Sequence, residues 1–204
     1  MSTLLAACVD GVESEANAIA ERWLGYGDGL FESIAICAGH MPLLDLHWQR
    51  LTLGCARLKL PMPDTALLQR EAQQLARRFP NSALKIIVGA SGEARGYARM
   101  PELRLRRALL VYPKPEAPAA LAVQGLRVRL CETTLAVQPA LAGIKHLNRL
   151  EQVLARSEWS DPEIHEGLMT NAAGEIICAT SANVFCASTG SGEPRRLIAA
   201  AWRA

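Results

Sequence analysis

The feature that most constrains the fold is a proline-rich segment near the middle of the chain. Residues 113–118 contain three prolines in six positions, a composition typical of a linker. The chain has 204 residues, which is enough for one large domain or two small ones. The sequence therefore predicts a first domain over residues 1–112, a linker over 113–118 and a second domain over 119–204.

The first half mixes strand and helix patterns. Short apolar runs bounded by turn residues predict four strands, at Leu4–Asp10, Leu30–Cys37, Ala83–Val88 and Leu103–Tyr112. The spacing of leucines predicts a helix that Asp45 caps and that ends before Pro61. A second helix is predicted over Asp64–Phe79, with Pro80 as its stop.

The second half continues the mixture. Leu126–Cys131 alternates like a strand, and His146–Ser157 is predicted to be a helix. The apolar stripe of this helix consists of Leu147, Leu150 and Leu154. Gly167–Thr170 and Glu175–Thr180 are predicted to form a hairpin. Together the two halves predict an α/β (mixed α+β) fold of two domains.

Composition and charge exclude several functional classes. Half of the residues are apolar and 21% are charged, as in a chain that buries a core. A net charge of +2 gives no field that would favour nucleic acid or an anionic membrane as a partner. No apolar run approaches the roughly 18 residues of a membrane span, and the run Leu4–Val9 is too short for a secretory signal. We therefore expect a cytoplasmic protein.

The six cysteines are scattered. None belongs to a C-x-x-C pair, and no histidine lies at metal-ligand spacing. We expect reduced, mostly buried thiols and no metal site.

One lysine stands out as a candidate nucleophile. The chain has four lysines, and Lys145 lies between apolar residues at the start of the predicted helix. Partial burial near a positive helix end disfavours the charged form of an amine, and the neutral amine is the nucleophile. The alternative is an ordinary surface lysine that extends to solvent, which is the more common case for a lysine taken at random.

Four segments, taken in order, resemble one known family. They are Gly25–Ser33, Leu46–Leu51, Gly143–Leu154 and Thr180–Phe185. Together they resemble the class IV aminotransferases, the fold-type IV pyridoxal phosphate enzymes. The run Ile-Lys-His-Leu-Asn-Arg-Leu at residues 144–150 is most similar to the 4-amino-4-deoxychorismate lyase branch. The resemblance extends over nearly all of the chain up to Phe185.

The resemblance implies a set of residues for binding pyridoxal 5'-phosphate. Lys145 matches the lysine to which the cofactor is attached and which then transfers protons. Arg50 matches the arginine that binds the cofactor phosphate, the alternative being an exposed helix arginine. Three residues match the loop that lies along the cofactor, namely Ser181, Ala182 and Asn183. Cys178 occupies the position at which the family usually has a glutamate paired with the pyridine nitrogen.

The resemblance also implies residues for binding substrate. Tyr26 and Ser33 match the small-domain segment that lines the substrate side, and Arg95 and Tyr97 match a loop near a substrate carboxylate. Arg95 would bind an anion there, the alternative being a solvated loop arginine.

Two departures from the family pattern affect the expected activity. A neutral thiol at Cys178 would stabilise a protonated pyridine less well than a carboxylate. After Phe185, the strands and the phosphate-binding helix start of the family are not recognisable in residues 186–204. We therefore expect a truncated or altered C-terminal part and an incomplete larger domain.

The leading functional hypothesis is a pyridoxal phosphate-dependent lyase of folate biosynthesis. It would convert 4-amino-4-deoxychorismate to 4-aminobenzoate and pyruvate. A branched-chain or D-amino-acid aminotransferase of the same fold is the nearest alternative. The others are a truncated non-catalytic homologue and a generic α/β binding domain whose arginines meet anions. The resemblance further implies a small-molecule substrate and a homodimer, with no nucleic acid or membrane partner.

Overall fold

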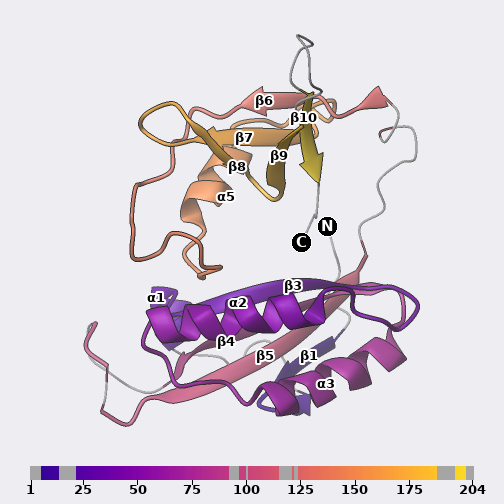
Figure 1. The fold of residues 1–204 in the computed structure, drawn as a ribbon, viewed down its shortest axis with the longest axis vertical. Helices are drawn as coiled ribbons and strands as arrows, with labels where there is room; N and C mark the ends of the chain where they lie inside the picture. Colours follow the sequence, from indigo (N-terminus) through magenta and orange to yellow (C-terminus); the bar gives the residue numbers. More distant parts are fainter. Residues whose placement is uncertain are drawn as a thin grey trace. The chain divides into compact units, whose positions relative to one another are not determined.

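The computed structural model describes residues 6–13, 22–91, 97–99, 101–114, 121, 124–187 and 196–200. The chain divides into two compact units (Figure 1). The first is Met1–Pro115 with Ala140–Leu147, and the second is Glu116–Pro139 with Asn148–Ala204. The first change of unit falls inside the expected linker. The segment that contains Lys145, however, belongs to the first unit and not to a domain over residues 119–204.

The first unit is built on an antiparallel sheet of five strands in the order β2-β1-β5-β4-β3. The strands are β1 (Ala6–Val9), β2 (Val12–Glu13), β3 (Gly29–Ile36), β4 (Ser82–Ser91) and β5 (Arg104–Pro113). All four strands predicted from the first half are present. Leu4 and Leu5 of the first prediction lie outside the described residues.

Among the described residues, the helices of this unit are α1 (Arg22–Tyr26), α2 (Leu44–Arg57) and α3 (Thr65–Arg78). Alternate side chains of a strand point to opposite faces of its sheet. On one face of β3, Leu30, Ile34 and Ile36 pack with Leu51 of α2 and Leu68 of α3 in the main hydrophobic core. This face of the sheet is therefore the one that the two long helices cover (Figure 1).

The helix ends test the predicted caps. Asp64 precedes α3, and its side chain accepts a hydrogen bond from the N–H of Leu67 at 2.9 Å. The prediction that Asp45 caps the preceding helix is wrong, because α2 begins at Leu44 and its N-cap is Leu43 in the left-handed region at φ 59°. Asp45 lies one residue further, in the first turn, where an acidic side chain still favours the positive helix end.

The edge strand β3 is extended by the returning segment Ala140–Leu147. The N–H of Phe31 donates to the carbonyl of Lys145 at 2.9 Å, and the N–H of Leu147 donates to the carbonyl of Gly29 at 3.0 Å. The prediction of a helix beginning at His146 is therefore wrong. The backbone of His146 forms a β-bridge with Leu30, and α5 comprises only Leu150–Arg156.

The described residues of the second unit form two small sheets. The first has the order β6-β7-β8, with β6 (Val128–Leu130) parallel to β7 (Glu166–Thr170) and β7 antiparallel to β8 (Ile176–Ala179). The second pairs β9 (Asn183–Ala187) with β10 (Arg196–Ala200). The predicted hairpin is confirmed by β7 and β8.

A small core holds the second unit together. Ala155 of α5 and Met169 of β7 are completely buried and cluster with Trp159 and Cys131. The predicted leucine stripe is not part of this core. Leu147 packs in the first unit, and Leu150 and Leu154 are 76% and 60% exposed. In the described part of the chain, no helix has the length and apolar character needed to cross a membrane.

Candidate functional site

The backbone of Lys145 is fixed against the edge of the first unit's sheet. Its carbonyl accepts the N–H of Phe31, and the Nζ of its half-buried side chain lies 4.6 Å from the centroid of the Phe31 ring. A cation over an aromatic face is attracted by the ring. The amine therefore lies against the aromatic ring of Phe31. The helix start that we expected beside it is not there, because α5 begins only at Leu150.

Arg50 is held by a buried carboxylate on the same strand. Glu32 of β3 is completely buried and accepts from Arg50 Nε at 2.7 Å and from Arg50 Nη2 at 2.5 Å. The Nδ1 atom of His47 lies 2.7 Å from the same carboxylate. Burial by itself would raise the pKa of Glu32, but the hydrogen bonds and charges of Arg50 and His47 lower it below its ordinary value. Glu32 is therefore an ionised group at neutral pH.

This pairing leaves one edge of the Arg50 guanidinium available. The Nη1 atom donates to no acceptor in the part of the chain that the structure describes, and 41% of the side chain is exposed. A guanidinium fork is well suited to a phosphate. The structure thus orients Arg50 through Glu32 while leaving donors for an anion.

Lys145 and Arg50 contact the side chains of two consecutive residues of β3. Phe31 lies under the amine, and Glu32 holds the guanidinium. Because neighbouring residues of a strand point to opposite faces, Arg50 is bound on the face that α2 covers and Lys145 lies over the other face. Ser33, a predicted substrate residue, shares the face of Phe31. Its buried Oγ has no hydrogen-bond partner in the described structure.

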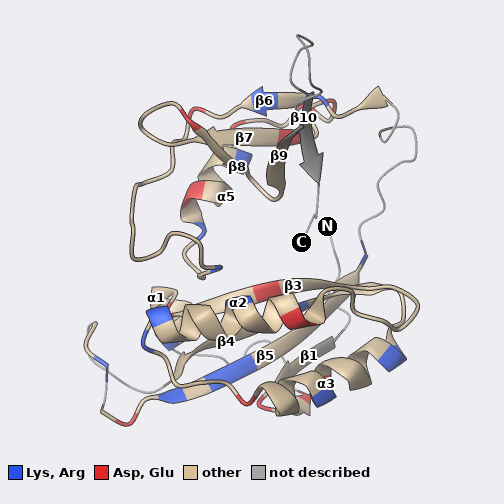
Figure 2. Cartoon of the chain, viewed as in Figure 1, with Lys and Arg blue, Asp and Glu red and all other residues tan. Residues whose placement is uncertain are grey.

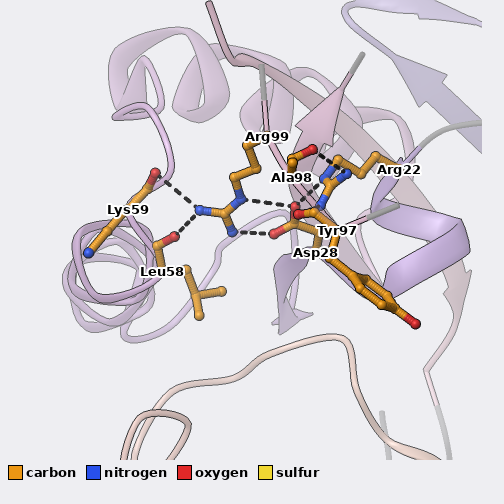
Figure 3. Close-up of polar contacts among 7 residues, drawn as sticks. All are labelled: Arg22, Asp28, Leu58, Lys59, Tyr97, Ala98 and Arg99. Carbon is orange, nitrogen blue, oxygen red and sulfur yellow. Dashed lines mark hydrogen bonds and ion pairs between the residues drawn. The ribbon is translucent and has the colours of Figure 1, made fainter. Parts of the chain in front are cut away.

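The turn before β3 is clamped by two arginines (Figure 3). Asp28 accepts from Arg22 Nε at 2.7 Å and from Arg99 Nε at 3.1 Å, and Arg99 Nη2 makes a further contact with it. Arg99 Nη1 also donates to the carbonyl of Leu58 at 2.5 Å, beside the end of α2. Although burial opposes ionisation, the two guanidinium groups lower the pKa of Asp28 below its ordinary value.

The same clamp brings two predicted substrate residues together. Arg22 donates to the carbonyls of Tyr97 at 2.6 Å and Ala98 at 3.3 Å, and its guanidinium lies 5.0 Å from the ring of Tyr26. The rings of Tyr26 and Tyr97 meet edge to face, with centroids 5.5 Å apart. Both tyrosines are exposed. Arg95, predicted beside them, lies outside the described residues.

The remaining predicted cofactor residues belong to the second unit, where one of them, Ser181, donates to a buried glutamate. Glu166 of β7 accepts hydrogen bonds from the hydroxyl of Thr180 and from that of Ser181, the latter at 2.5 Å. Ala182 is buried, and Asn183 is exposed at the start of β9. The loop of Ser181–Asn183 is thus anchored to β7 through its first hydroxyl.

Cys178 is directed toward the interior of the second unit. Its half-buried side chain packs against the cluster that contains Met169 and Trp159. Burial raises the pKa of its thiol above the ordinary value, so the group is neutral at physiological pH.

Sequence reasoning missed three charged residues near these groups, namely the buried Glu32 and Glu166 and Lys85, whose ammonium lies 5.1 Å from the Phe31 ring. Glu32 and Lys85 each interrupt an apolar strand segment, which was the available signal. A charged residue inside a buried strand requires a partner or a ligand. The partners themselves come from distant parts of the chain, and no local pattern identifies them.

Comparisons with known proteins agree on one family. The sequence model of the class IV aminotransferases matches residues 29–191. A curated relative, the aminodeoxychorismate lyase of Vibrio harveyi, is 29% identical over 177 residues, which is 87% of this chain and 65% of the relative. The chain therefore spans about two thirds of the length of that lyase.

Two solved structures extend the comparison. The crystal structure of 4-amino-4-deoxychorismate lyase from Pseudomonas aeruginosa is 43% identical with a TM-score of 0.82, over 87% of this chain and 66% of that chain. A hypothetical aminotransferase from Mycobacterium tuberculosis in its pyridoxal phosphate-bound form is 18% identical with a TM-score of 0.70, over 89% and 67% of the two chains. The second similarity concerns the fold alone. The mixed α/β fold that the sequence predicts is confirmed, and the chain belongs to the class IV aminotransferase family.

Proposed function

We propose that this chain is a pyridoxal phosphate-dependent lyase that converts 4-amino-4-deoxychorismate to 4-aminobenzoate and pyruvate in folate biosynthesis. The observation with most weight is the amine of Lys145, half-buried over Phe31 and fixed through its backbone to β3. The identity of 43% to the lyase from Pseudomonas aeruginosa supports this branch of the family over the others. The run at residues 144–150 supports it as well.

The donor groups of the first unit fit pyridoxal phosphate. The cofactor needs an amine for its aldehyde and a cation with several donors for its phosphate. Lys145 supplies the amine, and the unpaired edge of Arg50 supplies the donors. The two groups lie on opposite faces of the sheet at neighbouring residues of its edge strand β3, so a cofactor bound by both would extend around that edge. We propose these two side chains as the cofactor ligands of the first unit.

Residues of the second unit complete the proposed set. We propose that Ser181, Ala182 and Asn183 lie along the cofactor and that Cys178 stands where relatives use a carboxylate. A neutral, core-directed thiol stabilises a protonated pyridine poorly. We therefore expect slower proton removal than a glutamate at this position would give.

Lys145 has two tasks in the proposed reaction. Pyridoxal phosphate, when bound, supplies a sink for the electrons that proton removal leaves behind. The Nζ of Lys145 anchors the cofactor and, once released, takes the proton from the ring carbon that bears the substrate amine. The neighbouring ring C–O bond then breaks, and enolpyruvate leaves and takes up a proton at carbon to become pyruvate. The ring becomes aromatic, which strongly favours the products. The protein therefore has mainly to orient the substrate and move one proton.

An aminotransferase acting on branched-chain or D-amino acids is the nearest alternative. The two activities separate in a direct comparison of pyruvate release from 4-amino-4-deoxychorismate with amine transfer to a keto acid. The proposal requires the first and not the second.

A non-catalytic domain whose arginines bind anions is less well supported. The basic segment at the start of β5 (Figure 2) is largely neutralised within the chain. Arg106 pairs with Asp10 at 2.9 Å, and Arg107 pairs with Glu71 at 2.8 Å. Arginines engaged in this way offer little attraction to an external anion.

The proposal is tested by incubation with pyridoxal phosphate, borohydride reduction and peptide mapping. Because the chain has only four lysines, each can be followed separately. We expect the reduced adduct on Lys145, its loss in Lys145→Ala and its retention in Lys114→Ala. An adduct spread over the exposed lysines, or none at all, would refute the proposal and favour a non-catalytic homologue. We also propose a homodimer, which light scattering of the cofactor-treated chain tests.

A further inference from the structure

The face of the sheet that bears Lys145 contains a second lysine. Lys85 lies in the middle of β4 and pairs in register with Ser33 of β3. Directly opposed residues of an antiparallel pair share one face, and Phe31, two residues from Ser33, shares it too. The Nζ of Lys85 is 5.1 Å from the centroid of the Phe31 ring, and the Nζ of Lys145 is 4.6 Å from it. Two ammonium groups thus share one aromatic ring.

Lys85 lacks a counter-ion among the residues that the structure describes. Among the described residues its ammonium contacts only the Phe31 ring and forms no ion pair or hydrogen bond. The side chain is half-buried, and burial lowers the pKa of its amine. A cation withdrawn from water without a partner is unfavourable unless a ligand supplies the opposite charge. The position therefore favours a bound anion.

Ser33 adds a second unsatisfied group at the same place. Its Oγ is buried without a hydrogen-bond partner among the described residues, directly across the strand pair from Lys85. A buried hydroxyl with no partner is unfavourable, and an anionic oxygen would accept a hydrogen bond from it. Lys85 and Ser33 are the kind of donor pair that binds a carboxylate.

The chemistry of the proposed reaction calls for such a subsite. Its products, 4-aminobenzoate and pyruvate, each have one carboxylate, so the substrate presents two anionic groups. We infer that Lys85, assisted by the hydroxyl of Ser33, binds one of the two substrate carboxylates beside Lys145. This inference rests on the proposed function for the identity of the substrate. The anion subsite itself is a property of this sheet face.

Competitive labelling of the four lysines tests the inference on the whole chain, with or without pyridoxal phosphate. Trace acetylation followed by peptide mapping reports the reactivity of each amine, and the exposed Lys59 and Lys114 are internal controls. We expect 4-aminobenzoate or pyruvate to protect Lys85 several-fold, and 4-aminobenzamide, which lacks the charge, to give no protection. The acid that protects identifies which carboxylate is bound. Equal protection by the acid and the amide would overturn the inference, as would protection by inorganic phosphate alone, which would assign Lys85 to the cofactor.

Variants supply a second readout in the cofactor-loaded chain. Lys85→Met should raise KM for 4-amino-4-deoxychorismate about tenfold or more with a smaller effect on kcat, because a charge-assisted hydrogen bond is lost. Lys85→Arg should restore most of the affinity, and Lys114→Met should behave like the parent chain. An unchanged KM in Lys85→Met would overturn the inference.

The cofactor test separates this inference from the proposed function. An adduct on Lys145 without protection of Lys85 leaves the function and removes the subsite. Protection of Lys85 without an adduct on Lys145 does the reverse. An adduct on Lys85 in place of Lys145 contradicts both.

Discussion

Arg50 and Glu32 face each other fork to fork, with Arg50 Nε and Nη2 at 2.7 and 2.5 Å from the two carboxylate oxygens. Glu32 is completely buried, whereas the arginine remains partly exposed. Glu32 therefore fixes the orientation of Arg50, and the exposed edge of Arg50 can donate to a further acceptor. This relationship gives the first prediction.

Glu32→Gln should destabilise the chain by about 2 kcal/mol at neutral pH, because Arg50 and His47 lose the charge that they share. Urea unfolding measures the change. Glu102→Gln, at an exposed position, is the matched control and should have almost no effect.

The loss of stability in Glu32→Gln should also depend on pH. The pKa of Glu32 is lower in the folded chain than its ordinary value of 4.5, so its ionisation stabilises the fold above pH 4.5. That contribution disappears as the pH falls through the folded-state pKa. The difference in free energy of unfolding between the parent chain and Glu32→Gln should therefore become smaller in acid. A difference that stays constant from pH 7 to pH 3 would show that the charge of Glu32 is not what matters.

Asp28→Asn should loosen the attachment of Tyr97–Arg99 to the turn before β3. The variant keeps the size of the side chain but weakens two charge-assisted contacts, those with Arg22 and Arg99. Native-state trypsin cleavage after Arg99 should become about tenfold faster, since cleavage follows local opening. The exposed Asp45→Asn serves as control. Equal cleavage rates in all three chains would argue against the clamp.

Gly29→Ala should destabilise the junction between β3 and the segment that contains Lys145. A Cβ at this position would lie 2.4 Å from the carbonyl oxygen of Val88 and 2.8 Å from Cδ1 of Leu147. Backbone cannot retreat cheaply, so we expect a loss of about 1–3 kcal/mol and a weaker borohydride-trapped adduct. Gly25→Ala, where nothing lies within 4 Å of the added carbon, should melt like the parent. A comparable loss in both variants would contradict this explanation.

Cys55 should resist thiol reagents in the folded chain. It is completely buried in α2, and burial raises its pKa to about 11. At pH 8 we expect labelling of the half-buried Cys37 to precede that of Cys55, because reactivity follows exposure and thiolate content. In urea the two should react alike. Rapid native labelling of Cys55 would place it outside the core.

Much of the fold could be predicted where the hydrophobic pattern of a segment and the turn or capping residues at its ends agree. The strand predicted over Leu30–Cys37 differs from β3 (Gly29–Ile36) by one residue at each end, because its apolar run ends at a glycine turn. The helix predicted over Asp64–Phe79 is confirmed by α3, because a capping aspartate and a proline mark its ends. The hairpin of β7 and β8 follows from its turn residues. In each case the decisive interactions lie between residues near one another in the sequence.

The errors arise where distant residues decide the structure. The stretch after Lys145 has helical spacing, but its first residues pair with β3, more than a hundred positions away. Arg99 and Asp28 are separated by 71 positions. The lysine of the candidate site could be predicted from its neighbours in sequence, whereas the pairing of Glu32 with Arg50 and the place of Lys85 opposite Ser33 depend on contacts between distant segments.

The return of Ala140–Leu147 to the first unit means that the chain passes between the two units three times, near residues 115, 139 and 147. A fragment that ends at residue 115 would keep the residues of the five-stranded sheet without Lys145. The complementary fragment would keep the amine without the strand that orients it. Under the proposed function, recovery of a borohydride-trapped adduct on mixing the two halves would report the docking of residues 140–147 onto β3.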